Sequence, residues 1–457
     1  MITWRPAALV LVGALALAIF GGVSEGWTPP ALTGAGGGGW IWPAAGGLVL
    51  LVVLLSIVDI LLAASPRDIR LSREGDQAFW LGETATVRLT VHNGSVRPFD
   101  GRVRDAWVPS AGATPYSHDV RLEPGAQTVV ETTLTPTRRG DRPAVRVTLR
   151  AYGPLRLGYR QNRQRSATTR TPAWVLRVYP KFAARRFLPE KLARLRILDG
   201  VVVTRGRGQG TEFDTLREYV VGDDVRSIDW RASARRSDVV VRTWRPERDR
   251  RVLCVLDTGR TSAARIGDEP RLDAAIDAAL LLASLASRAD DRVDLLAIDT
   301  AVRASVTNVS KKTLLWRLVS AMAPLDPALV ETDFGLVAGE VLRRERKRAL
   351  VVLFTALEPA ALGEGLMPVL PRLAARHKVV VAAVHDPALT EMTTLPTEEP
   401  AAADVYAAAA AQRALAERDR VRAALRRFGV EVVDAPVDIF ASRVADAYLA
   451  MKATGRL

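Results

Sequence analysis

The side chains best suited to chemistry crowd into residues 206–261. Acids alternate there with arginines, and the set comprises Glu212, Arg217, Glu218, Tyr219, Asp223, Asp224, Arg226, Asp229, Trp230, Arg231 and Arg235. Paired carboxylates serve hydrolysis when their surroundings separate their pKa values. Adjacent acids among arginines both stay ionised instead, since arginine forks match carboxylates bidentately. The segment therefore predicts an ion-pair network anchored by Trp230 or a docking surface for a partner, with a hydrolytic centre as the alternative.

Other catalytic patterns find no support in the sequence. Cys254 lies in an apolar run without a nearby histidine, which argues against a Cys–His nucleophile and indicates a buried thiol in a reducing compartment. The chain has no phosphate-binding loop of the Gly-x-x-x-x-Gly-Lys-Ser/Thr type. Hydrolysis of ATP would therefore belong to a partner, and we predict no catalytic residues and no enzymatic activity.

The elements that must position these residues follow from residue 252 onward. Short apolar runs alternate with helical patterns, which predicts a parallel sheet covered on both faces. The predicted strands are 252–256, 293–298, 349–354, 378–384 and 430–434. Ligands in such folds bind beyond the carboxyl ends of the strands. Asp257 and Thr332 are expected at that edge.

Upstream, residues 66–165 alternate apolar and polar side chains with period two between Gly, Pro and Asn breaks, which predicts an all-β, sandwich-like module. Residues 166–251 read as a linker that includes the acid- and arginine-rich segment, in which 211–219 is predicted to be a short helix. The α/β domain is assigned to residues 252–457.

The N-terminal 65 residues predict two membrane-spanning helices, at about 7–23 and 41–64. Arg5 precedes the first, Arg67, Arg70 and Arg73 follow the second, and the connecting loop carries neither Lys nor Arg. The positive-inside rule then places the large C-terminal part in the cytoplasm. A cleaved signal peptide at 1–23 is the alternative.

The net charge of +14 first suggests nucleic acid as a partner. The arginines are interleaved with acids, and neither zinc-finger spacing nor alternating aromatic and basic residues occur. Attraction to an anionic membrane surface accounts for the charge as well, so no nucleic-acid partner is predicted.

The strand-end residues resemble the metal-ion-dependent adhesion site of the von Willebrand factor A fold. There an Asp-x-Ser-x-Ser loop, a Thr and a later Asp hold Mg²⁺, which suits hard oxygen ligands. The corresponding residues here are Asp257, Gly259, Thr261, Thr332 and Ala356. The site is degenerate, so we expect the fold without its metal. Mg²⁺ on Asp257, Thr261 and Thr332, with Glu358 compensating, is the alternative.

The run GQGTEFDTLREYVVGDDVRSIDWRASARRSDVVVRTW resembles the bacterial domain of unknown function 58 (DUF 58) family. The upstream TPTRRG and GPLRLG segments and the two N-terminal apolar stretches are similar to the layout of that family. This resemblance implies association with MoxR-type AAA+ ATPases, which remodel client proteins. We therefore expect a non-catalytic adaptor in the inner or plasma membrane that presents the ATPase to an unidentified protein client.

Overall fold

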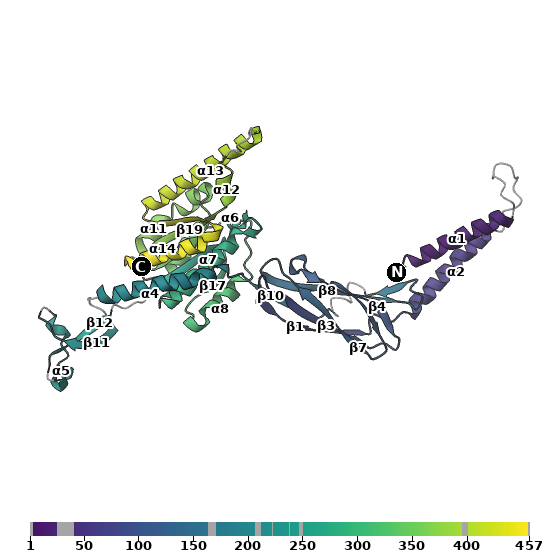
Figure 1. Ribbon diagram of the computed structural model, residues 1–457, viewed down its shortest axis with the longest axis horizontal. Helices are drawn as coiled ribbons and strands as arrows, with labels where there is room; N and C mark the ends of the chain where they lie inside the picture. Colours follow the sequence, from purple (N-terminus) through teal and green to yellow (C-terminus); the bar gives the residue numbers. More distant parts are fainter. Residues whose placement is uncertain are drawn as a thin grey trace. The chain divides into compact units, whose positions relative to one another are not determined.

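The chain forms two compact units, Met1–Tyr179 and Pro180–Leu457, in the computed structural model (Figure 1). The structure describes residues 3–24, 41–162, 171–205, 212–221, 223–236, 238–245, 250–394 and 401–455. Each unit has its own buried core.

Two apolar helices begin the first unit and pack against each other, α1 (Arg5–Ser24) and α2 (Ile41–Leu62). Among the described residues, the stretch Pro43–Leu62 is long and apolar enough to cross a membrane, and Arg5–Ile19 is a shorter apolar stretch. The predicted external loop, with Glu25, Trp27 and Trp40, lies outside the described residues.

Two mostly antiparallel sheets form the rest of the first unit, which we call the β module. One sheet has the order β1-β3-β7-β5, from β1 (Ile69–Gly75), β3 (Ala85–Asn93), β7 (Gln127–Leu134) and β5 (Ala113–Thr114). The other has the order β2-β10-β8-β4-β6, with β9 on β8, from β2 (Ala78–Trp80), β10 (Val175–Tyr179), β8 (Gly140–Tyr152), β4 (Phe99–Trp107), β6 (Ser117–Leu122) and β9 (Tyr159–Gln161). A short helix, η1 (Pro109–Ala111), follows β4.

The core of the β module draws on both sheets, because alternate side chains of each strand point inward. Leu89 and Val91 of β3 share a buried cluster with Phe99 and Val103 of β4. The module extends beyond the predicted boundary at residue 165, since β10 pairs with β8.

Helix α2 is joined to the β module through Asp59, which is buried near the helix end. Its carboxylate accepts backbone N–H groups from Leu155, Leu157 and Gly158 at 2.7, 2.8 and 3.0 Å. A Cβ on Gly153 would lie 2.3 Å from the carboxyl carbon of Asp59, so this approach requires glycine. These residues belong to the GPLRLG segment between β8 and β9.

The second unit is built on a six-stranded sheet with the order β17-β16-β13-β18-β19-β20. Its strands are β13 (Arg251–Asp257), β16 (Arg292–Ile298), β17 (Val302–Val306), β18 (Leu350–Phe354), β19 (Lys378–His385) and β20 (Glu431–Pro436). All pair in parallel except β17, an antiparallel edge strand that the sequence patterns missed.

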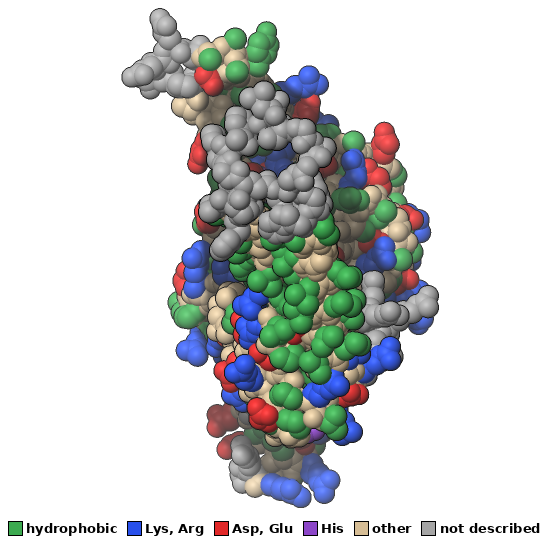
Figure 2. Space-filling model, turned by 90° about the vertical axis from the view of Figure 1, so that its right-hand side faces the viewer, with side chains coloured by type: hydrophobic (Ala, Val, Ile, Leu, Met, Phe, Trp, Pro, Cys, Tyr) green, Lys and Arg blue, Asp and Glu red, His purple; other side chains and the backbone are tan. Residues whose placement is uncertain are grey.

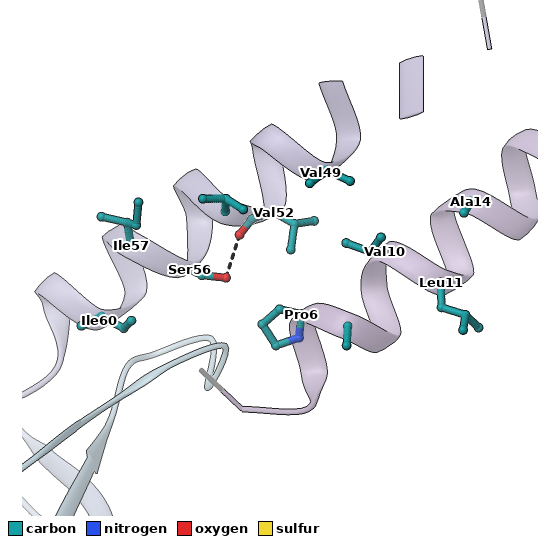
Figure 3. Close-up of a pocket in the computed structure, with 11 residues that line it drawn as sticks. Pro6, Val10, Leu11, Ala14, Val49, Val52, Ser56, Ile57 and Ile60 are labelled. Carbon is teal, nitrogen blue, oxygen red and sulfur yellow. Dashed lines mark hydrogen bonds between the residues drawn. The ribbon is translucent and has the colours of Figure 1, made fainter. Parts of the chain in front are cut away.

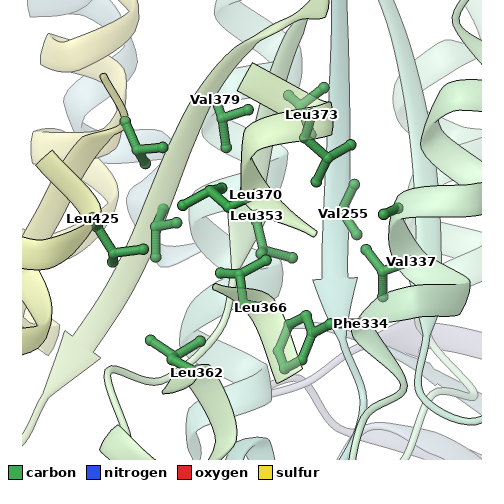
Figure 4. Close-up of a cluster of buried hydrophobic side chains, with 14 of the residues drawn as sticks. Val255, Phe334, Val337, Leu353, Leu362, Leu366, Leu370, Leu373, Val379 and Leu425 are labelled. Carbon is green, nitrogen blue, oxygen red and sulfur yellow. The ribbon is translucent and has the colours of Figure 1, made fainter. Parts of the chain in front are cut away.

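Helices cover both faces of this sheet. Side chains from α9 (Phe334–Arg344), α11 (Leu370–Arg376) and α13 (Ala402–Arg427) pack on one face against Val255, Leu353 and Val379 (Figure 4). The opposite face is contacted by α7 (Arg271–Arg288) and α14 (Val437–Ala453), which also contact α4 (Leu188–Arg205).

Cys254 is buried at mid-strand in β13, and burial raises the pKa of its thiol to about 12. The remaining elements are η2 (Ala183–Phe187), α6 (Arg260–Ala263), β14 (Arg265–Ile266), β15 (Glu269–Pro270), α8 (Lys311–Met322), α10 (Pro359–Ala361), η4 (Leu362–Leu366) and α12 (Pro387–Glu391).

The acid- and arginine-rich segment forms an antiparallel hairpin, which we call the signature arm (residues 212–245). It consists of β11 (Glu212–Glu218), η3 (Val225–Ser227), α5 (Trp230–Arg236) and β12 (Val240–Arg245). The predicted helix at 211–219 was wrong, because its described part is the strand β11. Hydrogen bonding to β12, far along the chain, outweighs the local helical signals.

Candidate functional site

Four side chains meet at the carboxyl edge of the second unit's sheet, Asp257, Thr261, Thr332 and Thr355, which we call the strand-end cluster. Strands β13 and β18 are paired through Leu256 and Phe354, so the residues that follow them lie side by side. Asp257 is only 2% exposed. Its Oδ1 accepts the Thr332 hydroxyl at 2.5 Å, and its Oδ2 accepts those of Thr261 and Thr355 at 3.1 and 2.6 Å.

Gly259 allows this close approach. Its N–H donates to Asp257 Oδ1 at 2.8 Å, while a Cβ at this position would lie 2.2 Å from Thr332 Oγ1 and 2.9 Å from the Val330 carbonyl oxygen. The serine that the adhesion-site pattern places here would therefore displace Thr332. Glycine lets the threonine hydroxyl contact the carboxylate directly.

Ion pairs surround the cluster. Arg260 pairs with Glu331 at 2.5 Å, so its charge is balanced. Glu358, the predicted substitute for the missing acid, pairs with Arg271 at 3.1 Å.

A second buried acid, Asp299, directly follows the neighbouring strand β16 and contacts the loop that follows β13. Its carboxylate accepts the Thr258 hydroxyl at 2.9 Å and Arg303 Nε at 2.7 Å. Burial disfavours its charge, but these hydrogen bonds outweigh burial and lower the pKa of Asp299.

The strand-end cluster does not fit a hard dication. Each carboxylate oxygen of Asp257 accepts two hydrogen bonds. The three threonines of the cluster contribute only neutral hydroxyls. Mg²⁺ requires near-octahedral oxygen ligation, usually with more than one carboxylate or phosphate. Within the described ranges, no group of three or more His, Cys, Asp or Glu side chains is placed to hold a metal. The structure brings Asp257, Thr261 and Thr332 together as the sequence predicts, and adds Thr355.

In the signature arm, Arg217 and Asp223 form a bidentate pair at 2.7 and 2.5 Å. The hydrogen bonds that it donates to Asp223 raise the pKa of the Arg217 guanidinium. Asp223 also accepts the N–H of Val220 at 3.0 Å, so the pair holds the turn that follows β11. Asp224 accepts the N–H of Arg226 at 3.0 Å and caps η3.

Asp229 takes its partner from β12 instead of from the neighbouring arginines. It accepts the N–H groups of Ala232 and Arg231 at 3.0 and 3.1 Å, and Arg242 Nε at 2.8 Å. The Ala232 N–H and then the Arg242 guanidinium lower the pKa of Asp229. Of the residues predicted to form an ion-pair network, Arg217 pairs with Asp223, whereas Asp229 pairs with Arg242, which lies outside the predicted set. Neither Asp223 nor Asp229 is in the apolar surroundings that keep a general acid protonated.

Trp230 is 67% exposed and does not anchor the network as the sequence analysis expected. Val221 is 94% exposed, and Val220 and Val225 are also exposed. Among the described residues, no carboxylate pairs with Arg226, Arg231 or Arg235. Tyr219 continues the hairpin through its N–H to the Val239 carbonyl at 2.8 Å, and Glu218 lies at the end of β11. The side chain of Glu212 lies outside the described part.

Comparisons with known proteins reach the arm and the α/β domain. Uncharacterised proteins of Mycobacterium tuberculosis and Mycobacterium bovis are each 30% identical over 190 residues, which is 40% of this chain and 58% of theirs. The chain thus matches little more than half the length of these relatives.

Solved structures give only remote likenesses. A β-glucosidase from Listeria innocua has a TM-score of 0.16 at 14% identity and covers 24% of this chain and 16% of its own. A GH20 exo-β-N-acetylglucosaminidase from Vibrio harveyi has a TM-score of 0.20 at 10% identity, covering 80% and 75%. Likenesses this remote indicate neither fold nor function. Residues 215–427 of the chain match the family described as protein of unknown function DUF58.

Proposed function

We propose that this chain is a non-catalytic, membrane-anchored adaptor that binds a protein partner through the signature arm. The observation that carries the proposal is the combination of exposed Trp230 and Val221 with an internally paired set of acids. Trp and Arg are enriched at interface hot spots, and exposed apolar side chains such as Val221 mark interaction sites. The paired acids give the arm a stable shape without offering a proton donor.

The α/β domain is proposed to be of the von Willebrand factor A type. If the six strands of the sheet are numbered along the chain from β13 as strand 1 to β20 as strand 6, their order in the sheet is 3-2-1-4-5-6. Strand 3, which is β17, is the antiparallel edge strand. Asp257 and Thr332 lie in loops at the carboxyl edge, where such domains bind partners. Because the cluster is closed by hydroxyls, we propose that binding here does not depend on Mg²⁺.

The proposed partner is a MoxR-type AAA+ ATPase, acting on a protein client near the membrane. This follows from the family resemblance, together with the absence of a phosphate-binding loop in the sequence. The ATPase surface that fits the arm has an apolar pocket for Trp230 with acidic side chains around it, which complement Arg226, Arg231 and Arg235. The apolar helix α2 supports placement in the inner or plasma membrane, with the second unit in the cytoplasm.

The test is binding of the detergent-solubilised chain to the purified MoxR-type ATPase of the same organism, measured by biolayer interferometry. Loss of a buried interface Trp costs about 2–4 kcal/mol, so Trp230→Ala should weaken binding by roughly 30-fold or more. Trp316→Ala is the matched control, because Trp316 is 60% exposed on α8 of the same unit. Equal affinities for the two variants would overturn the assignment of the arm as the docking surface.

A further inference from the structure

Arginine side chains surround the end of α2 that meets the β module. Arg97 Nη1 donates to the carbonyl of Leu61, and Arg160 Nη1 donates to that of Ala63 at 3.4 Å. The last carbonyls of a helix carry partial negative charge, which these guanidinium groups balance. Both side chains are exposed, and each guanidinium has five N–H donors, of which these contacts with described residues use one.

More basic side chains lie at this same end. Arg5 begins α1, Arg67 follows α2, and Arg70 lies in β1 opposite His92, close to the turn after β3. All three arginines are exposed.

Most of the nearby acids are already engaged. Asp59 is occupied by backbone amides, and Asp100 pairs with Arg121 and Arg156. Asp119, which pairs with Arg102, and Asp68 and Glu123 are exposed acids of this part of the module among the described residues. The surface is therefore basic, although it belongs to a module with many paired charges.

Exposed apolar side chains stand among these arginines. Val96, which precedes Arg97, is 92% exposed in the turn between β3 and β4. Leu155 is exposed in the loop that holds Asp59, and Trp4 is exposed just before α1. Indole and aliphatic side chains beside arginines favour the interface between headgroups and acyl chains.

An apolar groove begins at this basic end and runs between α1 and α2 (Figure 3). Its volume is about 560 Å³, and Pro6, Val10, Val52, Ile57 and Ile60 are among its lining residues. Ser56, its one hydroxyl-bearing lining residue, donates to the Val52 carbonyl of its own helix at 2.7 Å. Figure 2 shows hydrophobic side chains gathered on this face of the molecule, with basic and acidic side chains around them. The groove thus suits a hydrocarbon chain, and the exposed Arg5 is next in sequence to its lining residue Pro6.

We propose that this end of the β module is a lipid-binding surface selective for anionic phospholipids. Arg97 and Arg160 contact the lipid phosphate, Val96 and Leu155 enter the headgroup region, and one acyl chain lies in the groove between α1 and α2. The inference requires α2 to span the membrane but is independent of the signature arm. Its occupant is a membrane phospholipid, because a soluble phosphate would leave the groove and the exposed apolar side chains without a partner.

The experiment is native mass spectrometry of the full chain, delipidated in detergent and titrated with dioleoyl-phosphatidylglycerol or dioleoyl-phosphatidylcholine. Each arginine near the surface adds about fivefold to anionic-lipid binding, so the wild-type chain should prefer phosphatidylglycerol by roughly tenfold or more. The double variant Arg97→Gln/Arg160→Gln should lower that preference by roughly tenfold or more, and Arg97→Lys/Arg160→Lys should retain most of it.

The matched control is Arg104→Gln/Arg138→Gln, which makes the same charge change at exposed positions away from α2. Its preference for phosphatidylglycerol should equal that of the wild type. Equal affinity of the wild-type chain for both lipids, or equal losses in the two Gln doubles, would overturn the proposal. Displacement of the lipid by millimolar glycerol 3-phosphate would show that the headgroup alone binds and would refute the groove's role. ATPase binding should be unchanged in every variant, so this test and that of the signature arm fail separately.

Discussion

Asp257 shows how single residues determine what the strand-end cluster can bind. Its buried carboxylate accepts hydrogen bonds from three threonine hydroxyls and one backbone amide. Hydrogen bonds to an ionised group contribute more than neutral ones, and several around one carboxylate satisfy its acceptor sites. The same bonds hold the loops after β13 and β18 together with the loop that contains Thr332. The cluster therefore joins three loops at this edge of the sheet.

Replacing Thr332 by Val should remove one hydrogen bond to this buried carboxylate. We expect the free energy of unfolding to fall by about 1.5–3 kcal/mol, measured by denaturant titration of the solubilised chain. Thr390→Val, at an exposed helical position, is the control and should change stability by less than about 0.5 kcal/mol.

Calorimetric titration of the wild-type chain with Mg²⁺ should give no saturable heat, since the donor set does not fit the ion. Saturable heat that Asp257→Ala abolishes would show that the cluster opens to take the metal.

At the scale of elements, α2 and the loop between β8 and β9 are joined by a buried carboxylate. Asp59 near the helix end was visible in the sequence as the one charge in an apolar stretch, but its partners were not. Three backbone N–H groups converge on it, which makes the GPLRLG segment a receptor for this side chain. Any tilt of α2 would therefore be passed to β8 and β9.

Asp59→Asn tests this connection with little change in side-chain volume. In the favoured orientation the amide oxygen would accept from Leu157 and Gly158, and the NH₂ would face the N–H group of Leu155, leaving that donor without an acceptor at a cost of about 1–3 kcal/mol. We expect hydrogen exchange in peptides spanning 153–160 to accelerate by roughly tenfold or more. Ser56→Ala, which removes only a bond within α2, should leave these peptides unchanged. Unaltered exchange in Asp59→Asn would refute the connection.

At the scale of the whole molecule, the chain divides its roles between two units. The first carries the apolar helices and the β module, and the second carries the parallel sheet and the signature arm. An adaptor of the proposed kind needs the second unit on the cytoplasmic side. Cys254 is buried with a pKa of about 12, so the thiolate that reacts with maleimides is scarce, and introduced cysteines report topology cleanly.

We expect Thr33→Cys to react with a membrane-impermeant maleimide in intact spheroplasts. Thr454→Cys, near the C-terminus, should react only after permeabilisation. Labelling is read on gels, with the unmodified chain as the background control. Reaction of Thr454→Cys in intact spheroplasts would contradict the cytoplasmic orientation.

The sequence by itself determined the features that depend on local periodicity. Apolar stretches, period-two strands and the alternation of strands with helices are encoded in neighbouring residues, and β13, β16, β18, β19 and β20 lie where the patterns predicted strands. The meeting of Asp257 and Thr332 was also predictable, because Asp257 ends a parallel strand, Thr332 lies in a loop that precedes a helix, and both positions were expected at the carboxyl edge of the sheet.

Only the tertiary structure decided the contacts that depend on register and burial between distant segments. Thr355 reaches Asp257 because β18 is paired in register with β13, and Asp229 is paired with Arg242 because β12 returns beside β11. The exposure of Trp230 likewise depends on which surfaces pack against α5, which no spacing along the chain encodes. Side-chain partners are selected by the summed packing of both units, so they follow from the fold and not from the local pattern.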